Sequence, residues 1–284
     1  MSFGARVITV RFGPRTALED VSLEVAAGEV TAVVGGDGAG KTTLLRVLVG
    51  AVAPTTGQVR RPDPDRIGHL PATSGTYPDL TVRENLAFVA SAYGVPADVA
   101  RERAGELLTR TGLTDALDRL AGELSGGMRR KLGVVCAMLH RPELLVLDEP
   151  TTGIDPVSRA DLWWLIARVA AEGAAVVLAT SYLDEAERAA WILALDAGRT
   201  LAEGTAADIV AAVPGTVCRT AERPSGELAR LAWRRGAAWR VWLPEGRPPT
   251  GGPAPLEPVS PDLADAITVA ALAREVAAAG GRRA

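Results

Sequence analysis

An apolar run that turns through glycines into a second apolar segment limits the folds open to this chain. Val30–Val34 has the pattern of a buried strand, and Gly35-Gly36-Asp37-Gly38-Ala39-Gly40-Lys41-Thr42 follows it directly. Leucine and valine then recur over residues 44–48 with helical spacing. Glycines between a strand and a helix direct backbone N–H groups and a helix N-terminus at one point, which suits a polyphosphate. The pattern predicts a phosphate loop that binds a nucleoside triphosphate.

Side chains of this loop carry specific roles in that prediction. Lys41 is expected to neutralise charge on the β- and γ-phosphates, and the Thr42 hydroxyl to ligate Mg²⁺. Thr43 is included in the candidate nucleotide site beside residues 35–42. A chance match to a glycine-rich turn is the alternative, and the strand before it and the helix after it argue against chance.

The bulk properties of the chain narrow its class. Its 284 residues suffice for one large α/β domain with a small appendage. A formal net charge of −3 gives no basic footprint, so no nucleic-acid partner is expected. Cys136 and Cys218 lie far apart without metal-type spacing, which fits packing roles in a reducing cytoplasm.

No segment of the sequence predicts membrane insertion. The first ten residues lack the basic segment and long apolar run of a signal peptide. No charge-free apolar stretch approaches the roughly 20 residues that span a bilayer. We therefore expect a soluble chain, whose membrane role, if it has one, comes through a partner.

Apolar periodicity predicts a mixed architecture. Strands are expected near residues 7–11 and 21–25 and at 67–70, 144–147, 175–179 and 191–196, with helices at 81–93, 98–111, 156–171 and 184–190. Thr81 and Glu84 form a capping-box pattern. Continuous apolar strands indicate a parallel sheet covered on both faces. Beyond residue 213, strands at 217–220 and 239–243, helices at 225–235 and from about 262, and a loop at 244–258 predict a small α+β lobe.

Two further constellations carry polar chemistry. Leu124-Ser125-Gly126-Gly127-Met128 precedes an amphipathic helix, and its hydroxyl and glycine amides form a candidate second anion site. The run 144–150, Leu-Leu-Val-Leu-Asp-Glu-Pro, is a buried strand ending in two carboxylates. Asp148 is placed to hold Mg²⁺ through water, and Glu149 to accept a proton from attacking water. A solvated acidic loop is the alternative, which the nearby phosphate loop makes less favourable.

Together these runs resemble the ATP-binding subunits of ABC transporters over about residues 3–212. The phosphate loop, the signature at 124–128, the run 144–150 and the loop Gly153-Ile154-Asp155-Pro156 carry the resemblance. It implies an α/β P-loop NTPase core (3–212) with an antiparallel β-subdomain and an inserted helical subdomain at about 72–140. A small α+β accessory domain (213–284) completes the expected fold.

The resemblance also assigns roles to residues. Phe12 stands where the family stacks an aromatic ring on adenine. The family forms a head-to-tail dimer with ATP between one subunit's phosphate loop and the other's signature, so Ser125, Gly126 and Gly127 would serve the partner's nucleotide. Asp155 would couple the two sites. Whether the dimer is homodimeric or heterodimeric stays open.

Weaker patterns resemble the drug- and polyketide-export branch of the family. They are residues 182–187, residues 195–198 and Asp262-Leu263-Ala264-Asp265. This branch implies an ATPase that drives a separate membrane permease from the inner face of the cell membrane. Residues 73–93 correspond to the permease contact, and Tyr77 and Leu80 are the expected exposed apolar contacts.

The chain departs from the family pattern at three positions. Ala72 replaces a glutamine that touches Mg²⁺ and the attacking water, Ser181 replaces the switch histidine, and Asp37 replaces an asparagine. Ser181 is a candidate to reach the γ-phosphate through a water. One interpretation is a weakened half-site that works best beside a second, complete ATPase subunit; the other is a subfamily variation with ordinary turnover.

ATP-driven export is the function we favour from the sequence, with ATP and Mg²⁺ as cofactors. One alternative is a nucleotide-sensing or regulatory subunit with little or no turnover, because Ala72 and Ser181 replace catalytic groups. Another is a regulator acting on ribosome or DNA, whose relatives commonly carry two cassettes or long coiled-coil insertions. Neither feature is present in this sequence.

Overall fold

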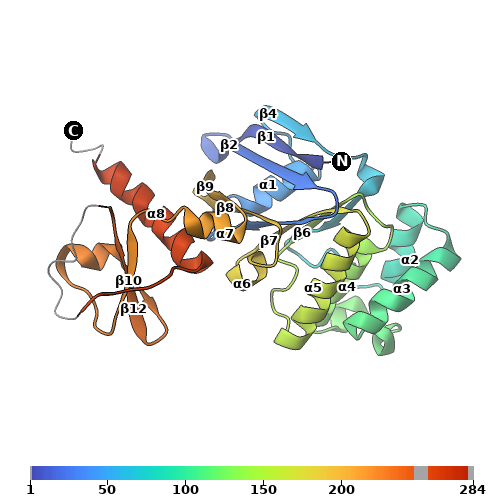
Figure 1. The fold of residues 1–284 in the computed structure, drawn as a ribbon. Coiled ribbons are helices and arrows are strands. Elements are labelled where there is room, and N and C mark those ends of the chain that lie inside the picture. The colour runs from blue at the N-terminus through green and yellow to red at the C-terminus, as the bar shows by residue number, and fades with distance from the viewer. Residues whose placement is uncertain (1, 246–254, 281–284) are drawn as a thin grey trace. The chain divides into compact units, whose positions relative to one another are not determined.

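The structure is a computed structural model that describes residues 2–245 and 255–280 (Figure 1). It divides into two compact units, Met1–Thr200 and Leu201–Ala284. This division lies twelve residues before the expected boundary after residue 212. The domain bounds 3–212 and 213–284 stay a prediction.

A six-stranded sheet has five of its strands wholly within the first unit. Its strand order is β5-β6-β7-β3-β8-β9. The bounds are β5 Ile67–Leu70, β6 Leu144–Asp148, β7 Ala175–Thr180, β3 Val30–Val34, β8 Trp191–Asp196 and β9 Arg199–Gly204. The pairs β5–β6, β6–β7, β7–β3 and β3–β8 are parallel. Every residue of β3, β6 and β7 is buried. The continuous apolar runs therefore predicted parallel, doubly covered strands correctly.

The register of this sheet brings three chain segments to one edge. Strand β7 lies between β3 and β6, with Val34 opposite Thr180 and Asp148 opposite Ala179. The residues that follow these three strands leave the sheet side by side. In parallel α/β sheets this carboxyl edge is where ligands bind.

A three-stranded antiparallel sheet, ordered β2-β1-β4, shares a core with this sheet. Its strands are β1 Ser2–Phe12, β2 Arg15–Ala26 and β4 Thr56–Arg60. Helix α1 (Lys41–Leu48) supplies Leu44, Leu45, Val47 and Leu48 to the same core. The expected antiparallel β-subdomain is thus present.

Helices fill the chain between β5 and β6. They are α2 Val82–Ala92, α3 Ala97–Thr111 and α4 Gly126–Met138, with short 3₁₀ turns at Thr114–Ala116 and Ala121–Glu123. Figure 1 shows them gathered on one side of the first unit, away from the antiparallel sheet. The Thr81 side chain accepts from Glu84 N at 3.1 Å, and Thr81 N donates to Glu84 Oε2 at 2.8 Å. The predicted capping box therefore starts α2.

Two further helices of the first unit differ in how well the sequence predicted them. Helix α5 spans Pro156–Ala171, as expected. Helix α6 spans only Leu183–Ala186, so the expected helix at 184–190 was too long. The physical reason is that Ala190 N donates to Val30 O at 2.8 Å, which commits the backbone there to the sheet.

The second unit holds a four-stranded sheet ordered β11-β12-β10-β13. Its elements are α7 Ala206–Ala211, β10 Thr216–Thr220, a 3₁₀ turn Gly226–Leu231, β11 Ala232–Arg235, β12 Ala238–Leu243, β13 Glu257–Pro258 and α8 Leu263–Gly280. The helix expected at 225–235 was wrong for its second half. Residues 226–231 form a 3₁₀ turn, but β11 pairs with β12 through a turn at Gly236, whose φ is 60°. Residues 246–254 of the expected loop lie outside the described residues.

Buried side chains agree with the packing roles expected for both cysteines, which are free thiols. Burial raises the pKa of Cys136 to about 12, so this thiol stays protonated and unreactive at neutral pH. Within residues 2–245 and 255–280, no helix has the length and apolar character needed to cross a bilayer.

Replacing Leu145 by alanine tests the central sheet. Leu145 is fully buried on β6, so Leu145→Ala should lower the free energy of unfolding by roughly 2–5 kcal/mol through lost contacts and a cavity. Val157→Ala, at a side chain that is 77% exposed, should change it by less than about 0.5 kcal/mol. Chemical denaturation measures both; equal losses would contradict the assignment of β6 to the core.

Candidate functional site

A cavity of about 750 Å³ opens at the carboxyl edge of the parallel sheet. It brings together the phosphate loop, the two carboxylates at the end of β6 and the end of β1. The lining residues are Phe12, Arg15, Thr16, Ala17, residues 36–43, Ala72, Asp148, Glu149, Ala197 and Gly198. Most of the predicted nucleotide-binding residues therefore meet in one hollow.

The loop between β3 and α1 has a backbone that glycine makes possible. Gly35 has φ 154°, and a Cβ there would lie 2.4 Å from Leu195 O. Gly40 has φ 108°, and a Cβ there would lie 2.6 Å from Leu18 Cδ2. Neither position accepts a side chain without displacing its neighbours. This path leads the chain directly into the first turn of α1.

The start of α1 is suited to an anion. Gly40 occupies its N-cap position, no side chain caps the helix, and its first turn has no acidic residue. The first-turn amides therefore have no side-chain acceptor, and the helix dipole favours negative charge there. A phosphate group in the cavity would meet these amides.

Lys41 adds a buried cation to this loop. Its side chain is 9% exposed, and Nζ donates to Gly35 O at 2.6 Å and to Gly36 O at 3.3 Å. Nζ also lies 3.9 Å from Glu149 Oε1, an ion pair between the loop and the carboxylate after β6. The cation and the candidate base are therefore neighbours in the cavity.

Glu149 is held by its backbone and by its carboxylate. Its φ of 53° is uncommon for a residue with a side chain. Ser181 Oγ donates to Oε1 at 2.6 Å, Ser181 N to Oε2 at 3.3 Å, and Thr152 Oγ1 to Oε2 at 3.1 Å. Ser181, which we expected to reach phosphate, contacts Glu149 and does not line the cavity. These contacts orient a candidate general base.

Thr42 and Asp148 supply the predicted metal ligands, and both line the cavity. A hydroxyl and a carboxylate are hard oxygen donors, the type that Mg²⁺ prefers. The part of the chain that the structure describes has no group of three or more His, Cys, Asp or Glu arranged for a metal. Phosphate oxygens and water would complete the coordination, as is usual for Mg²⁺ beside a nucleotide.

The signature residues lie apart from this cavity. Ser125 caps α4 by accepting from Met128 N at 3.2 Å, and Asp155 caps α5 by accepting from Val157 N and Ser158 N at 3.1 and 3.0 Å. Hydrogen bonds from Ser158 hold the pKa of Asp155 below its ordinary value. Ser125, Gly126, Gly127 and Asp155 are not among the cavity's lining residues. Their assignment to a second subunit's nucleotide stays a prediction.

Sequence reasoning missed part of the cavity rim. Arg15 lies opposite Phe12 across the turn between β1 and β2, a position that the Gly13-Pro14 turn signal could have indicated. Ala197 and Gly198 join the rim from the end of β8. Gly198 N donates to Ala39 O at 3.0 Å, a contact between distant segments that carries no local sequence signal.

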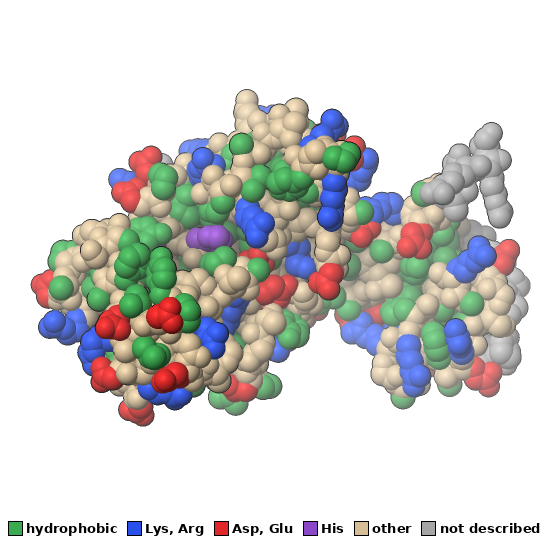
Figure 2. Space-filling view, turned by 180° about the vertical axis from the view of Figure 1, so that it is seen from behind, with side chains coloured by type: hydrophobic (Ala, Val, Ile, Leu, Met, Phe, Trp, Pro, Cys, Tyr) green, Lys and Arg blue, Asp and Glu red, His purple; other side chains and the backbone are tan. Residues whose placement is uncertain are grey.

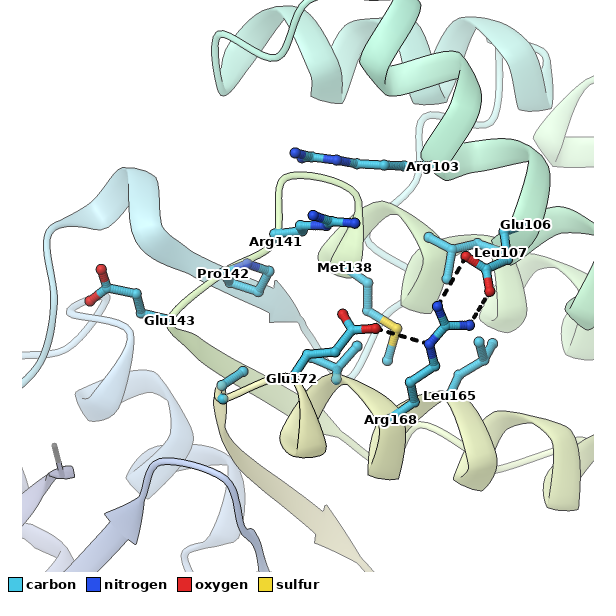
Figure 3. Close-up of a pocket in the computed structure, with 13 residues that line it drawn as sticks. Arg103, Glu106, Leu107, Met138, Arg141, Pro142, Glu143, Leu165, Arg168 and Glu172 are labelled. Atoms are coloured by element: carbon cyan, nitrogen blue, oxygen red, sulfur yellow. Dashed lines mark hydrogen bonds and ion pairs between the residues drawn. The ribbon is translucent and has the colours of Figure 1, made fainter.

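A second cavity, of about 410 Å³, lies among α3, the end of α4 and α5 (Figure 3). Arg168 lies between Glu106 and Glu172 there, with Nε donating to Glu172 Oε1 at 2.9 Å. This cavity shares no lining residue with the phosphate cavity. The carboxylates and Arg168 neutralise one another, so the phosphate cavity is the stronger candidate site.

Fold and site together define a P-loop nucleotide-binding protein with an ABC-type signature. The profile of a family described as "ABC transporter" matches residues 18–152. The chain is 40% identical over 200 residues to the probable multidrug ABC transporter ATP-binding protein YbhF of Escherichia coli (strain K12), covering 67% of this chain and 35% of that protein. It is 39% identical over 229 residues to the daunorubicin resistance ATP-binding protein DrrA3 of Streptomyces coeruleorubidus, covering 77% of this chain and 72% of that protein.

A solved structure, titled as the ATP-binding subunit of an ABC transporter, superposes with a TM-score of 0.69. It is 31% identical and covers 74% of this chain and 92% of that chain. This chain belongs to the ABC transporter ATP-binding family, which confirms the resemblance and the fold class. The match to YbhF spans only about a third of that relative, so the activity, substrates and partners of the whole protein are proposals.

Replacing Gly35 by alanine tests the loop. Because a Cβ at residue 35 would lie 2.4 Å from Leu195 O, Gly35→Ala should move the loop and weaken MgATP binding at least about tenfold in isothermal titration calorimetry. Gly105→Ala, in α3 with open space around the new methyl, should bind like the unmodified chain. Equal affinities for both variants would show that this loop does not hold the nucleotide.

Proposed function

We propose that this chain binds and hydrolyses ATP to drive export by a separate membrane permease. The observation that carries the proposal is the convergence of Lys41, Thr42, Asp148 and Glu149 on one cavity at the sheet edge. A phosphate loop alone supports binding. An oriented carboxylate beside it supports hydrolysis.

In the proposed mechanism the triphosphate lies along the loop and the first turn of α1. Lys41 neutralises charge on the β- and γ-phosphates. Thr42 and Asp148 would hold Mg²⁺, which supplies positive charge to the phosphate oxygens. Glu149 accepts a proton from water as the water oxygen bonds to the γ-phosphorus and the bond to the ADP oxygen breaks. ADP and inorganic phosphate are the products.

Glu149 owes its direction to Ser181 in this mechanism. The hydroxyl of Ser181 donates to Oε1 at 2.6 Å and leaves the second oxygen to Ser181 N and Thr152. Ala72 lines the cavity but offers only a methyl group. Glu149 would thus position the water without a side-chain amide from residue 72. The rate of hydrolysis decides between a weakened half-site and ordinary turnover.

A second ATP-binding chain would complete the site. Ser125, Gly126 and Gly127 begin α4 away from their own phosphate cavity, as a signature that covers a partner's nucleotide requires. Asp155 caps α5 directly after Gly153 and Ile154, which pack closely against Gly127 of the signature. The partner is a copy of this chain or a related subunit. ATP binding would close the pair, and hydrolysis with product release would reopen it.

The helical part of the first unit offers a surface for the permease. Tyr77 is 50% exposed and packs edge-to-face on Phe88, which is 46% exposed, with ring centroids 4.8 Å apart. Leu80, which was expected to be exposed as well, is half-buried. Figure 2 shows hydrophobic side chains gathered over the helical part of this unit. Binding there would place the chain on the inner face of the membrane.

Export rather than import is supported by the names of two relatives. YbhF is described as belonging to a multidrug transporter and DrrA3 as a daunorubicin resistance protein. A sensing subunit without turnover is less well supported, because Glu149 is retained and held in place. The cargo path would belong to the permease.

Glu149→Gln tests the hydrolytic role. The amide keeps the size of the side chain but cannot accept the water proton at neutral pH, so kcat should fall about 10²–10⁴-fold. MgATP binding should persist, because the loop and Lys41 are unchanged. Steady-state release of phosphate and calorimetry measure the two effects, and normal turnover by the variant would rule out Glu149 as the base.

Ser181→Ala tests the orientation of the base. Losing one hydrogen bond to the carboxylate should lower kcat by about tenfold with little change in MgATP affinity. Thr109→Ala, which removes a hydroxyl bonded within α3, is the control. A higher kcat for the Ala72→Gln variant than for the unmodified chain would support the weakened half-site. An equal kcat would support ordinary turnover.

A further inference from the structure

The guanidinium of Arg130 is enclosed by backbone carbonyls. Arg130 lies on α4 shortly after the Ser125 cap and is only 7% exposed. Three of its contacts go to the loop after β5, where Nη1 donates to the carbonyls of Pro71, Ala72 and Thr73 at 3.0, 3.0 and 2.6 Å. The rest go to the turn after β6, where Nε and Nη2 donate to Glu149 O at 3.0 and 2.8 Å and Nη2 also donates to Asp148 O.

Two of these hydrogen bonds converge on the carbonyl of the candidate base. The forked donors of arginine fix the direction of that carbonyl more firmly than one donor can. The backbone of Glu149 is left-handed, with φ 53°, and its side chain leaves this turn toward Ser181 and Lys41. Because Arg130 fixes the backbone carbonyl of Glu149, it also fixes the direction in which the Glu149 side chain leaves the backbone.

The same guanidinium joins this turn to the loop that contains Ala72. The methyl of Ala72 has no group to donate or accept, so its side chain cannot make a polar link to the carboxylates. Gly133, one turn further along α4, lets the loop approach closely, since a Cβ there would lie 2.1 Å from Ser74 O. Helix α4 thus holds the loop at 71–74 by Arg130 and by close packing.

The charge of Arg130 suits its surroundings. Burial lowers the pKa of the guanidinium, and the nearby carboxylates of Asp148 and Glu149 oppose this by raising it. Arginine stays protonated under these conditions. A lysine would keep the charge but lose the planar fork.

We propose that Arg130 is a positioning residue for ATP hydrolysis, which fixes the left-handed turn at Glu149 and joins it to the loop at 71–73. The inference rests on the proposed function, in which Glu149 is the base. Arg130 acts through Glu149 and does not touch the nucleotide. Its loss would change the rate of the chemical step and leave nucleotide binding largely intact.

Arg130→Lys and Arg130→Gln test this role, with Arg103→Gln as the matched control. Arg103 also donates to a backbone carbonyl, Leu139 O at 3.3 Å, away from the phosphate cavity. Both Arg130 variants should lower kcat by about 10²-fold, as expected from a misplaced catalytic group. The Kd for MgATP by calorimetry should change by less than about threefold, and Arg103→Gln should keep kcat.

A double-mutant cycle with Glu149→Gln separates positioning from general structural support. If Arg130 acts through Glu149, Arg130→Lys should cause no further loss of single-turnover rate in the Glu149→Gln background. A multiplicative loss in that background, unchanged kcat in the single variants, or failure of both variants to fold or bind MgATP would overturn the proposal. If the unmodified chain hydrolyses no ATP, the proposed function itself fails, which is a distinct result.

Discussion

The parallel register across β3, β7 and β6 is the constraint on which the rest of this structure depends. Val34 lies opposite Thr180, and Asp148 lies opposite Ala179, so the chain leaves these three strands at one edge. The phosphate loop, Ser181 and Glu149 meet for that reason alone. Because each strand is buried on both faces, a shift of one residue would exchange side chains between the two covered faces, disrupt their packing and displace the site residues. Burial and site geometry therefore stabilise the same arrangement.

Helix α4 connects the signature segment of the first unit to the turn that carries the candidate base. Its N-terminus carries the Ser125 signature, and Arg130 reaches the turn of the candidate base. The next residue, Lys131, donates to Ser158 Oγ at 2.7 Å at the start of α5, beside Asp155. Hydrogen bonds from Arg130 and Lys131 therefore join α4 both to the turn after β6 and to the start of α5.

Much of the fold was readable from the sequence because its elements are decided locally. The β3–loop–α1 unit, the Thr81 cap and α5 follow from apolar periodicity and end signals within a few residues. The helix expected at 225–235 is a 3₁₀ turn only over Gly226–Leu231, because residues 232–235 pair with β12 across Gly236 and this pairing outweighs local helix propensity. Helix α6 ends early because Ala190 pairs with Val30, far away in the chain. The misses therefore occur where long-range backbone pairing decides the conformation.

The sequence by itself determined the chemical groups of the site: the glycine path, Lys41 and Thr42, and two carboxylates at a strand end. Their identity and order can be read from neighbouring residues, although strand β3 itself forms only by pairing with β7 and β8. Tertiary structure alone decided that Ser181 holds Glu149, that Arg15 and Gly198 complete the rim, and that Arg130 turns inward to the carbonyls of distant loops. The physical reason is that side-chain direction and hydrogen-bond partners depend on which distant strands and helices pack together, and that packing leaves no mark at any single position of the chain.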